Sequence, residues 1–171
     1  MKVATKSIKL TALASAVLAA GLVMSPTAFA GGQTSLPVTA KISGVCKVTT
    51  APGTLDFGTI DPSGSSTITP TSTFVMKCSN GTTSTAATDN NGLNVSGGVK
   101  RMVHSVTGTA YLPYAITYGN DTGFAGAGFG GAAGSQTVTI NGTITPAQYA
   151  GALATAGAEI YTDTVTITVN P

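Results

Sequence analysis

The residue types that most often do chemistry are sparse in this sequence. It has two cysteines, Cys46 and Cys78, and one histidine, His104, which stands between Val103 and Ser105. A lone histidine in such a segment is more typical of a solvated strand residue than of a general base. No cysteine–histidine cluster has the spacing of a metal site, and no G-x-S-x-G segment would activate a serine. We therefore expect no enzymatic activity, no catalytic residue, no metal and no cofactor.

One segment matches a nucleotide-binding pattern. Gly126, Gly128 and Gly131 fit G-x-G-x-x-G, but a dinucleotide site also needs a strand before the glycines and a helix after them. Glycine is dense throughout residues 119–134, and no helical pattern follows. The match therefore has little weight, and we expect residues 119–134 to form a long mobile loop.

Length and charge exclude several classes of protein. The chain has 171 residues, enough for one domain, and 42% of them are apolar, too many for a disordered acidic tail. Only 8% of the residues are charged, with eight basic and six acidic side chains. Because no basic cluster could neutralise phosphates, we expect no nucleic-acid partner.

The N-terminus has the order of a secretion signal. A basic stretch, Met1–Lys9, precedes an apolar run, Leu10–Met24, and Ala28-Phe29-Ala30 places small residues where a signal peptidase cuts. The run is too short for a membrane anchor, since a spanning helix needs about 20 apolar residues. We expect residues 1–30 to be removed on export to an oxidising compartment, where Cys46 and Cys78 would form a disulfide. Two free buried thiols are the alternative.

The exported chain is predicted to be all-β. Threonine alternates with valine and isoleucine, the period-two pattern of strands with one wet and one buried face. The expected strand segments are Leu36–Ile42, Thr54–Ile60, Thr67–Cys78, Tyr111–Tyr118, Gln136–Ile144 and Tyr161–Val169. About seven strands joined by short turns favour an immunoglobulin-like sandwich. One short helix is expected in Pro146–Ala156.

Parity decides how the chain passes Asn141-Gly142. A two-residue hairpin there would turn Ile144 away from Val138 and Ile140, whereas a continuous strand keeps all three on one face. We predict the continuous strand, with a possible bulge at Gly142.

Five motifs occur in an order that resembles the spore coat protein U domain. The first cysteine follows an alternating segment, and the second closes Phe74-Val75-Met76-Lys77-Cys78. The other motifs are Leu55-Asp56-Phe57-Gly58, Leu112-Pro113-Tyr114 and the final run from Tyr161 to Val169. The resemblance covers residues 34–169. That domain occurs in secreted coat proteins and in subunits of archaic chaperone–usher pili.

The resemblance implies an incomplete sandwich, residues 44–171, whose missing last strand leaves an apolar groove. A periplasmic chaperone, and then the N-terminal segment of a neighbouring subunit, would fill this groove. Residues 31–43 would be that donor segment, with Leu36, Val38, Ala40 and Ile42 on one face. Val165, Ile167 and Val169 would line the acceptor groove and contact the chaperone. Without the resemblance, residues 34–42 would be taken as an ordinary first strand of their own domain.

Three functions are compatible with these features. The leading hypothesis is a non-enzymatic structural subunit of a surface pilus, exported through the periplasm and an outer-membrane usher and polymerised by donor-strand exchange with its own or other pilus subunits. It would support attachment or biofilm formation. The alternatives are a secreted self-assembling coat or matrix protein, and a glycan-binding module whose surface would be the glycine-rich loop with Phe124 and Phe129.

Overall fold

The computed structural model describes residues 31–130 and 134–171. These residues fall into two units that divide after Thr39, and each unit is described by itself. The expected signal peptide, residues 1–30, lies outside the described residues. Residues 31–45 are neither strand nor helix, and Leu36, Val38 and Ile42 are 83%, 85% and 90% exposed. The strand predicted for Leu36–Ile42 is therefore absent from the single chain, as expected of an alternating segment without a partner edge.

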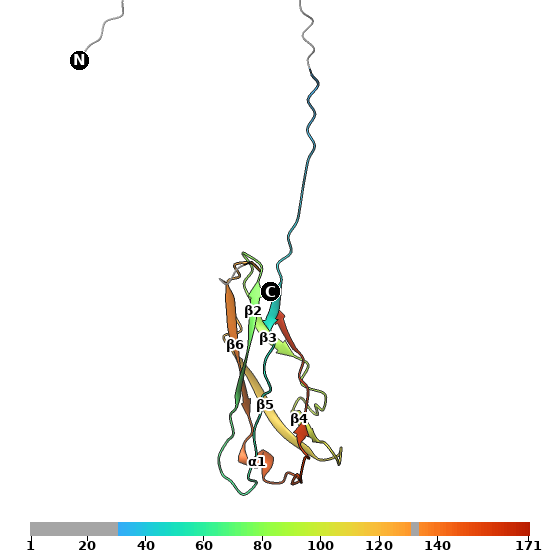
Figure 1. Ribbon diagram of the computed structural model, residues 1–171, viewed down its shortest axis with the longest axis vertical. Helices are drawn as coiled ribbons and strands as arrows, with labels where there is room; N and C mark the ends of the chain where they lie inside the picture. Colours follow the sequence, from blue (N-terminus) through green and yellow to red (C-terminus); the bar gives the residue numbers. More distant parts are fainter. Residues whose placement is uncertain (1–30, 131–133) are drawn as a thin grey trace, which may run out of the picture. The chain divides into compact units, whose positions relative to one another are not determined.

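Antiparallel strands dominate the unit that begins at Ala40 (Figure 1). The elements are β1 (Cys46–Thr50), β2 (Thr71–Cys78), β3 (Thr85–Asp89), β4 (Lys100–His104), β5 (Tyr111–Gly119), β6 (Ser135–Thr143), α1 (Pro146–Tyr149), β7 (Tyr161–Thr162) and β8 (Ile167–Asn170). One sheet has the order β1-β2-β6-β5-β4-β7, and a second pairs β3 with β8. The predicted all-β class is confirmed.

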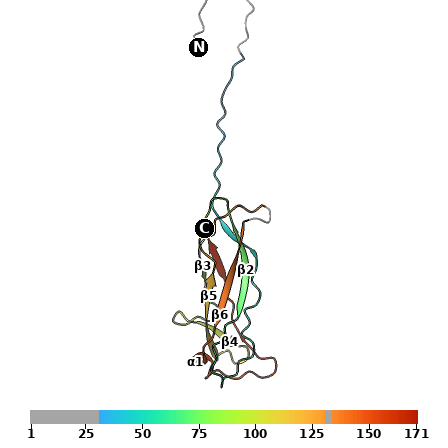
Figure 2. The ribbon, with the colours of Figure 1, turned by 90° about the vertical axis from the view of Figure 1, so that its left-hand side faces the viewer.

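The two sheets enclose an apolar core. Phe74 and Met76 of β2 and Val138 and Ile140 of β6 are buried, and Ile167 and Val169 of the second sheet pack against them. β2 and β6 lie side by side in both views of the ribbon (Figure 2). A second cluster contains Leu112, Tyr114, Ile144 and Tyr149. Alternate residues of each strand point into the core, as the period-two pattern predicted.

The continuous strand through Asn141-Gly142 is confirmed, without a bulge. Gly142 pairs with Ile116 in an unbroken register between β5 and β6, and its N–H donates to the Pro70 carbonyl over 2.9 Å. A Cβ at Gly142 would lie 2.8 Å from Phe57 Cζ and 2.9 Å from Leu55 Cδ2. Glycine is needed at this position because residues 55 and 57 pack directly on the strand.

Three local predictions differ from the structure, and two strands were missed. Thr54–Ile60 is not a strand, although Leu55, Phe57 and Ile60 are half-buried, because the segment packs its side chains inward without a partner strand. The expected helix is a single turn, Pro146–Tyr149. The predicted strand Tyr161–Val169 is divided into β7, which pairs with β4, and β8, which pairs with β3. Strands β3 and β4 were not predicted.

Residues 121–128 of the expected mobile loop are held by hydrogen bonds. Gly123 N–H donates to the Ser84 carbonyl over 2.9 Å, and Ser84 N–H donates to the Phe124 carbonyl over 3.0 Å. Phe124 is half-buried and packs against the core. We call residues 121–128 the strap. A half-buried Phe124 leaves less aromatic surface for the glycan site considered above.

His104 is buried rather than solvated, with 2% of its surface exposed. Its Nδ1 accepts N–H groups from Val106 and Thr107, and its ring meets the Tyr161 ring edge-on, with centroids 5.1 Å apart. Its Nε2 lies 3.6 Å from the Glu159 carboxylate. These contacts give His104 a structural role at the start of β7.

Candidate functional site

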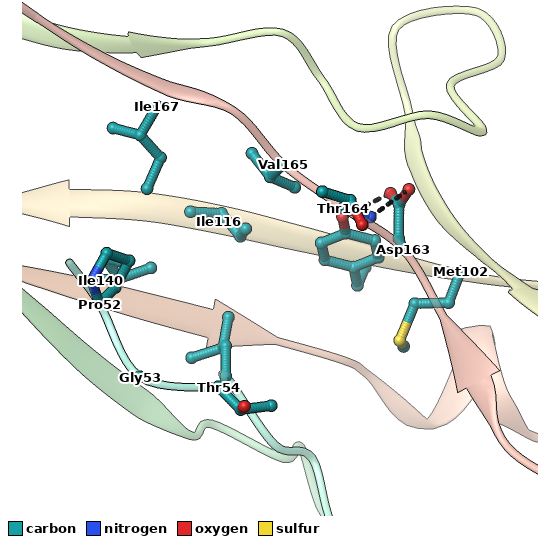
Figure 3. Close-up of a pocket in the computed structure, with 12 residues that line it drawn as sticks. Pro52, Gly53, Thr54, Met102, Ile116, Ile140, Asp163, Thr164, Val165 and Ile167 are labelled. Carbon is teal, nitrogen blue, oxygen red and sulfur yellow. Dashed lines mark hydrogen bonds between the residues drawn. The ribbon is translucent and has the colours of Figure 1, made fainter.

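An apolar groove runs between the chain after β1 and the final segment of the chain. One cavity of about 320 Å³ and an adjoining one of about 210 Å³ share Pro52, Val165 and Ile167 as lining residues. Figure 3 shows Val165 and Ile167 on one side, residues 52–54 on the other, and Ile116 of β5 between them. The buried core residues Phe74 and Ile140 form part of its lining. Ile116, Val165 and Ile167 are only half-buried, so a further strand could cover their remaining surface.

Both walls of the groove have an unpaired strand edge. Among the described residues, β1 pairs only with β2, and β8 pairs only with β3. The Thr166 carbonyl accepts the Asn90 N–H over 3.1 Å, and the Thr166 N–H donates to the Asn90 side chain over 2.9 Å. Because successive residues of a strand direct their backbone groups to opposite edges, the backbone groups of Val165 and Ile167 point toward the groove. An inserted strand would meet both apolar side chains and free backbone groups.

One end of the groove is polar and fixed. Asp163 accepts hydrogen bonds from the Tyr114 hydroxyl over 2.7 Å and from the N–H groups of Leu93 and Thr164, each over 2.8 Å. The pKa of the Tyr114 phenol is raised well above its usual range, mainly because the residue is buried and secondly because it is hydrogen-bonded to Asp163. The phenol therefore stays protonated and keeps donating. This network anchors the chain where it passes from one sheet to the other.

The structure brings part of the predicted acceptor set together. Val165 and Ile167 line the groove, whereas Val169 packs against the core cluster of β2 and β6. The opposite wall, residues 52–55, was missed by the sequence interpretation. The sequence feature that could have indicated this wall is the alternation of Leu55 and Phe57 with polar residues. We interpreted that alternation as a strand.

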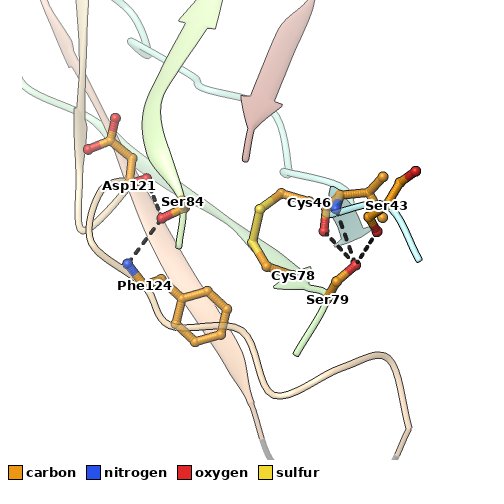
Figure 4. The surroundings of a disulfide bond; sticks show 8 residues. Ser43, Cys46, Cys78, Ser79, Ser84, Asp121 and Phe124 are labelled. Atoms are coloured by element: carbon orange, nitrogen blue, oxygen red, sulfur yellow. Dashed lines mark hydrogen bonds between the residues drawn. A yellow bond between two sulfur atoms is a disulfide. The ribbon is translucent and has the colours of Figure 1, made fainter. Parts of the chain in front are cut away.

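The predicted disulfide is present. Cys46 and Cys78 are direct partners across β1 and β2, with Cα atoms 4.1 Å apart, and their sulfur atoms are bonded (Figure 4). The bond fastens β1, whose Val48 lines the groove, to the core strand β2.

Other kinds of site were sought in the described residues. No three histidine, cysteine or carboxylate side chains gather there as a metal site. No helix in the same residues is long and apolar enough to cross a membrane.

Comparisons with known proteins indicate the family. One solved structure with a similar chain is the CsuC–CsuE chaperone–tip adhesion subunit pre-assembly complex from archaic chaperone-usher Csu pili of Acinetobacter baumannii. The identity is 22% and the TM-score 0.44, over 75% of this chain and 40% of that chain, so the present sequence spans about two-fifths of that neighbour. No curated protein matches. The Spore Coat Protein U domain matches residues 33–168, and this chain therefore belongs to the spore coat protein U domain family.

Proposed function

We propose that this protein is a structural, non-enzymatic subunit of a chaperone–usher surface pilus. Residues 31–43 of one copy, or of another pilus subunit, would fill the groove of the next subunit as a donated strand. Before assembly, a periplasmic chaperone would occupy the groove. An outer-membrane usher would then export the subunits to a fimbrium that supports attachment or biofilm formation.

One observation carries the proposal: the chain has both an unfilled groove and an unused strand segment. The groove exposes apolar side chains and backbone groups between residues 48–55 and residues 163–167. In an extended strand, Leu36, Val38, Ala40 and Ile42 would share one face, and the three large side chains are at least 83% exposed. Burial of each large side chain is worth about 1.5–3 kcal/mol, and an added strand supplies backbone hydrogen bonds. An exposed strand edge with apolar neighbours also favours association over monomers.

Two aspartate variants test whether Val38 belongs to the donated strand and Ile167 to the groove that receives it. Val38→Asp would place an unpaired charge in a neighbour's groove, at a cost of several kcal/mol. We expect it to abolish fibres while capture by the chaperone persists. Ile167→Asp damages the groove itself, so it should abolish both fibres and the chaperone complex. The measurements are fibre ladders on unheated gels and co-purification with the chaperone.

Thr39→Asp is the matched control. Thr39 neighbours Val38 but has the opposite parity in an extended strand, so its side chain would face solvent. We expect near-normal fibres from this variant. Loss of the chaperone complex in Val38→Asp, to the same extent as in Ile167→Asp, would place residues 31–43 in the core of their own domain. The donor-strand proposal would then be wrong.

A further inference from the structure

The point where the proposed donor segment joins its own domain is held by hydrogen bonds. Val45 N–H donates to Ser79 Oγ over 3.2 Å, and Ser79 N–H donates to the Val45 carbonyl over 2.9 Å. The Ser79 hydroxyl also lies 3.4 Å from the carbonyl oxygens of Ser43 and Val45 (Figure 4). Ser43 follows directly after Ile42, the last apolar residue of the segment. The C-terminal end of the proposed donor segment is therefore held to the turn after β2.

Close packing also restrains the middle residue of this segment. A Cβ at Gly44 would lie 2.7 Å from Thr82 Oγ1 and 3.4 Å from Thr82 Cγ2. The glycine therefore lets residues 43–45 lie directly against the turn that follows β2. One residue further on, the disulfide joins Cys46 to Cys78 at the other side of this turn.

The strap is hydrogen-bonded to the same turn, residues 78–82. Gly126 N–H donates to the Thr82 carbonyl over 2.8 Å, and Gly81 N–H donates to the Gly126 carbonyl over 3.2 Å. Gly128 N–H donates to the Cys78 carbonyl over 3.0 Å. The glycine-rich segment, which resembled a nucleotide motif in sequence, thus braces the turn on which residues 43–45 rest.

We infer that residues Ser43–Val45 form a rigid joint that sets the angle between successive subunits of the fibre. The inference rests on the proposed function, because only a donated segment 31–43 connects two subunits through this joint. A flexible linker lacks such contacts, whereas Ser43 and Val45 are hydrogen-bonded to Ser79 and Gly44 lies against Thr82. In a fibre, the end of the donated segment would therefore be held to its own domain, and the fibre would be stiff at this position.

The test measures angles between adjacent subunits in electron micrographs of assembled fibres. Gly44→Ala should at least double the width of the angle distribution, because the new methyl group displaces residues 43–45 from Thr82. Thr82→Ala added to Gly44→Ala should restore the wild-type width, since the remaining Thr82 Cβ would lie 3.6 Å from the new methyl group. Ser79→Ala, which removes the hydroxyl contacts, should also broaden the distribution. Ser135→Ala, at an exposed serine of β6, is the control and should leave it unchanged.

Two failures are distinguishable in this experiment. Absence of fibres from the wild-type protein contradicts the proposed function. Wild-type fibres whose angle distribution is as broad as that of Gly44→Ala and Ser79→Ala contradict the joint alone. If Gly44→Ala does not fold, hydrogen exchange of the Val45 N–H in wild type and Ser79→Ala decides the matter. We expect at least tenfold faster exchange in the variant, and an unprotected Val45 N–H in the wild type would overturn the joint.

Discussion

Single glycines mark the places where two segments of the chain lie too close together for a side chain. Gly126 is the tightest example among the residues discussed, because a Cβ there would overlap the carbonyl oxygens of Ser79 and Cys78. Its own N–H and carbonyl are both hydrogen-bonded to residues 81–82. Glycine is therefore required by contact with backbone atoms, which cannot move aside as a side chain can.

This contact predicts that alanine destabilises the protein at one glycine of the loop and has almost no effect at another. Gly126→Ala should reduce the free energy of unfolding by about 1–3 kcal/mol, the usual cost of overpacking. Gly130 has no atom within 4 Å of a built Cβ, so Gly130→Ala should change the stability by less than about 0.5 kcal/mol. Denaturant unfolding of the two variants measures the difference. Equal stabilities would mean that the strap is not held against residues 78–82.

The two sheets are connected by a polar link between three strands. Asp89 of β3 accepts the Tyr118 hydroxyl of β5 over 2.8 Å and pairs with Lys100 of β4 over 3.0 Å. Burial opposes the ionisation of Asp89, but the hydrogen bonds from Tyr118, Lys100 and the Asn91 N–H, together with the Lys100 charge, outweigh it. The pKa of this carboxyl is therefore below its usual value.

The lowered pKa predicts an acid-sensitive contribution to stability. The unfolded carboxyl titrates near pH 4, so the contribution is complete above that pH and is lost as the pH falls toward the lower folded pKa. Tyr118→Phe removes one hydrogen bond to the carboxylate and should bring its pKa nearer the usual value. We expect the variant to be less stable at pH 7 and to lose less of its remaining stability between pH 4 and pH 2, as measured by denaturant unfolding. An unchanged pH dependence would show that Tyr118 does not stabilise the charged form.

The sequence predicted those elements whose alternation reports burial directly. β2 and β6 were expected because Phe74 and Val138 recur with their neighbours at period two, and β5 because it is rich in aromatic and β-branched residues. β3 and β4 were missed: β3 has the small residues Thr85–Asp89, and β4 buries only His104 fully. Such strands are specified by the neighbours that they pair with, so their own residues show little periodicity.

The groove was only partly predictable for a related reason. Val165 and Ile167 share one parity, which identifies one wall, but their opposition to residues 52–55 depends on long-range packing. Asp163 has no distinguishing pattern in the sequence, and its hydrogen bond with Tyr114 joins positions 49 residues apart in the chain. Alternation in the sequence shows which side chains of a strand share a face. The segment that lies opposite this face depends on how the whole chain folds.

The domain as a whole exposes surfaces that a complete sandwich would bury. Within the described residues, β1 and β8 each have one unpaired edge, and the N-terminal segment leaves three large apolar side chains in solvent. A domain with a native stability of about 5–15 kcal/mol would gain a substantial fraction of that value if a strand filled such a groove. The stability of the isolated protein should therefore depend on what occupies the groove.

A synthetic peptide with the sequence of residues 31–43 tests this dependence in solution. A ligand that binds only the folded protein adds RT ln(1 + [L]/Kd), or about 2.7 kcal/mol at 100 times Kd. We therefore expect the midpoint of thermal unfolding of the exported chain to rise with peptide concentration. The same peptide with the Val38→Asp change should give a much smaller rise, and the Thr39→Asp peptide should behave as the unmodified one. Unfolding midpoints that do not respond to the unmodified peptide, or that respond equally to all three, would show that the groove does not recognise the alternating face of residues 36–42.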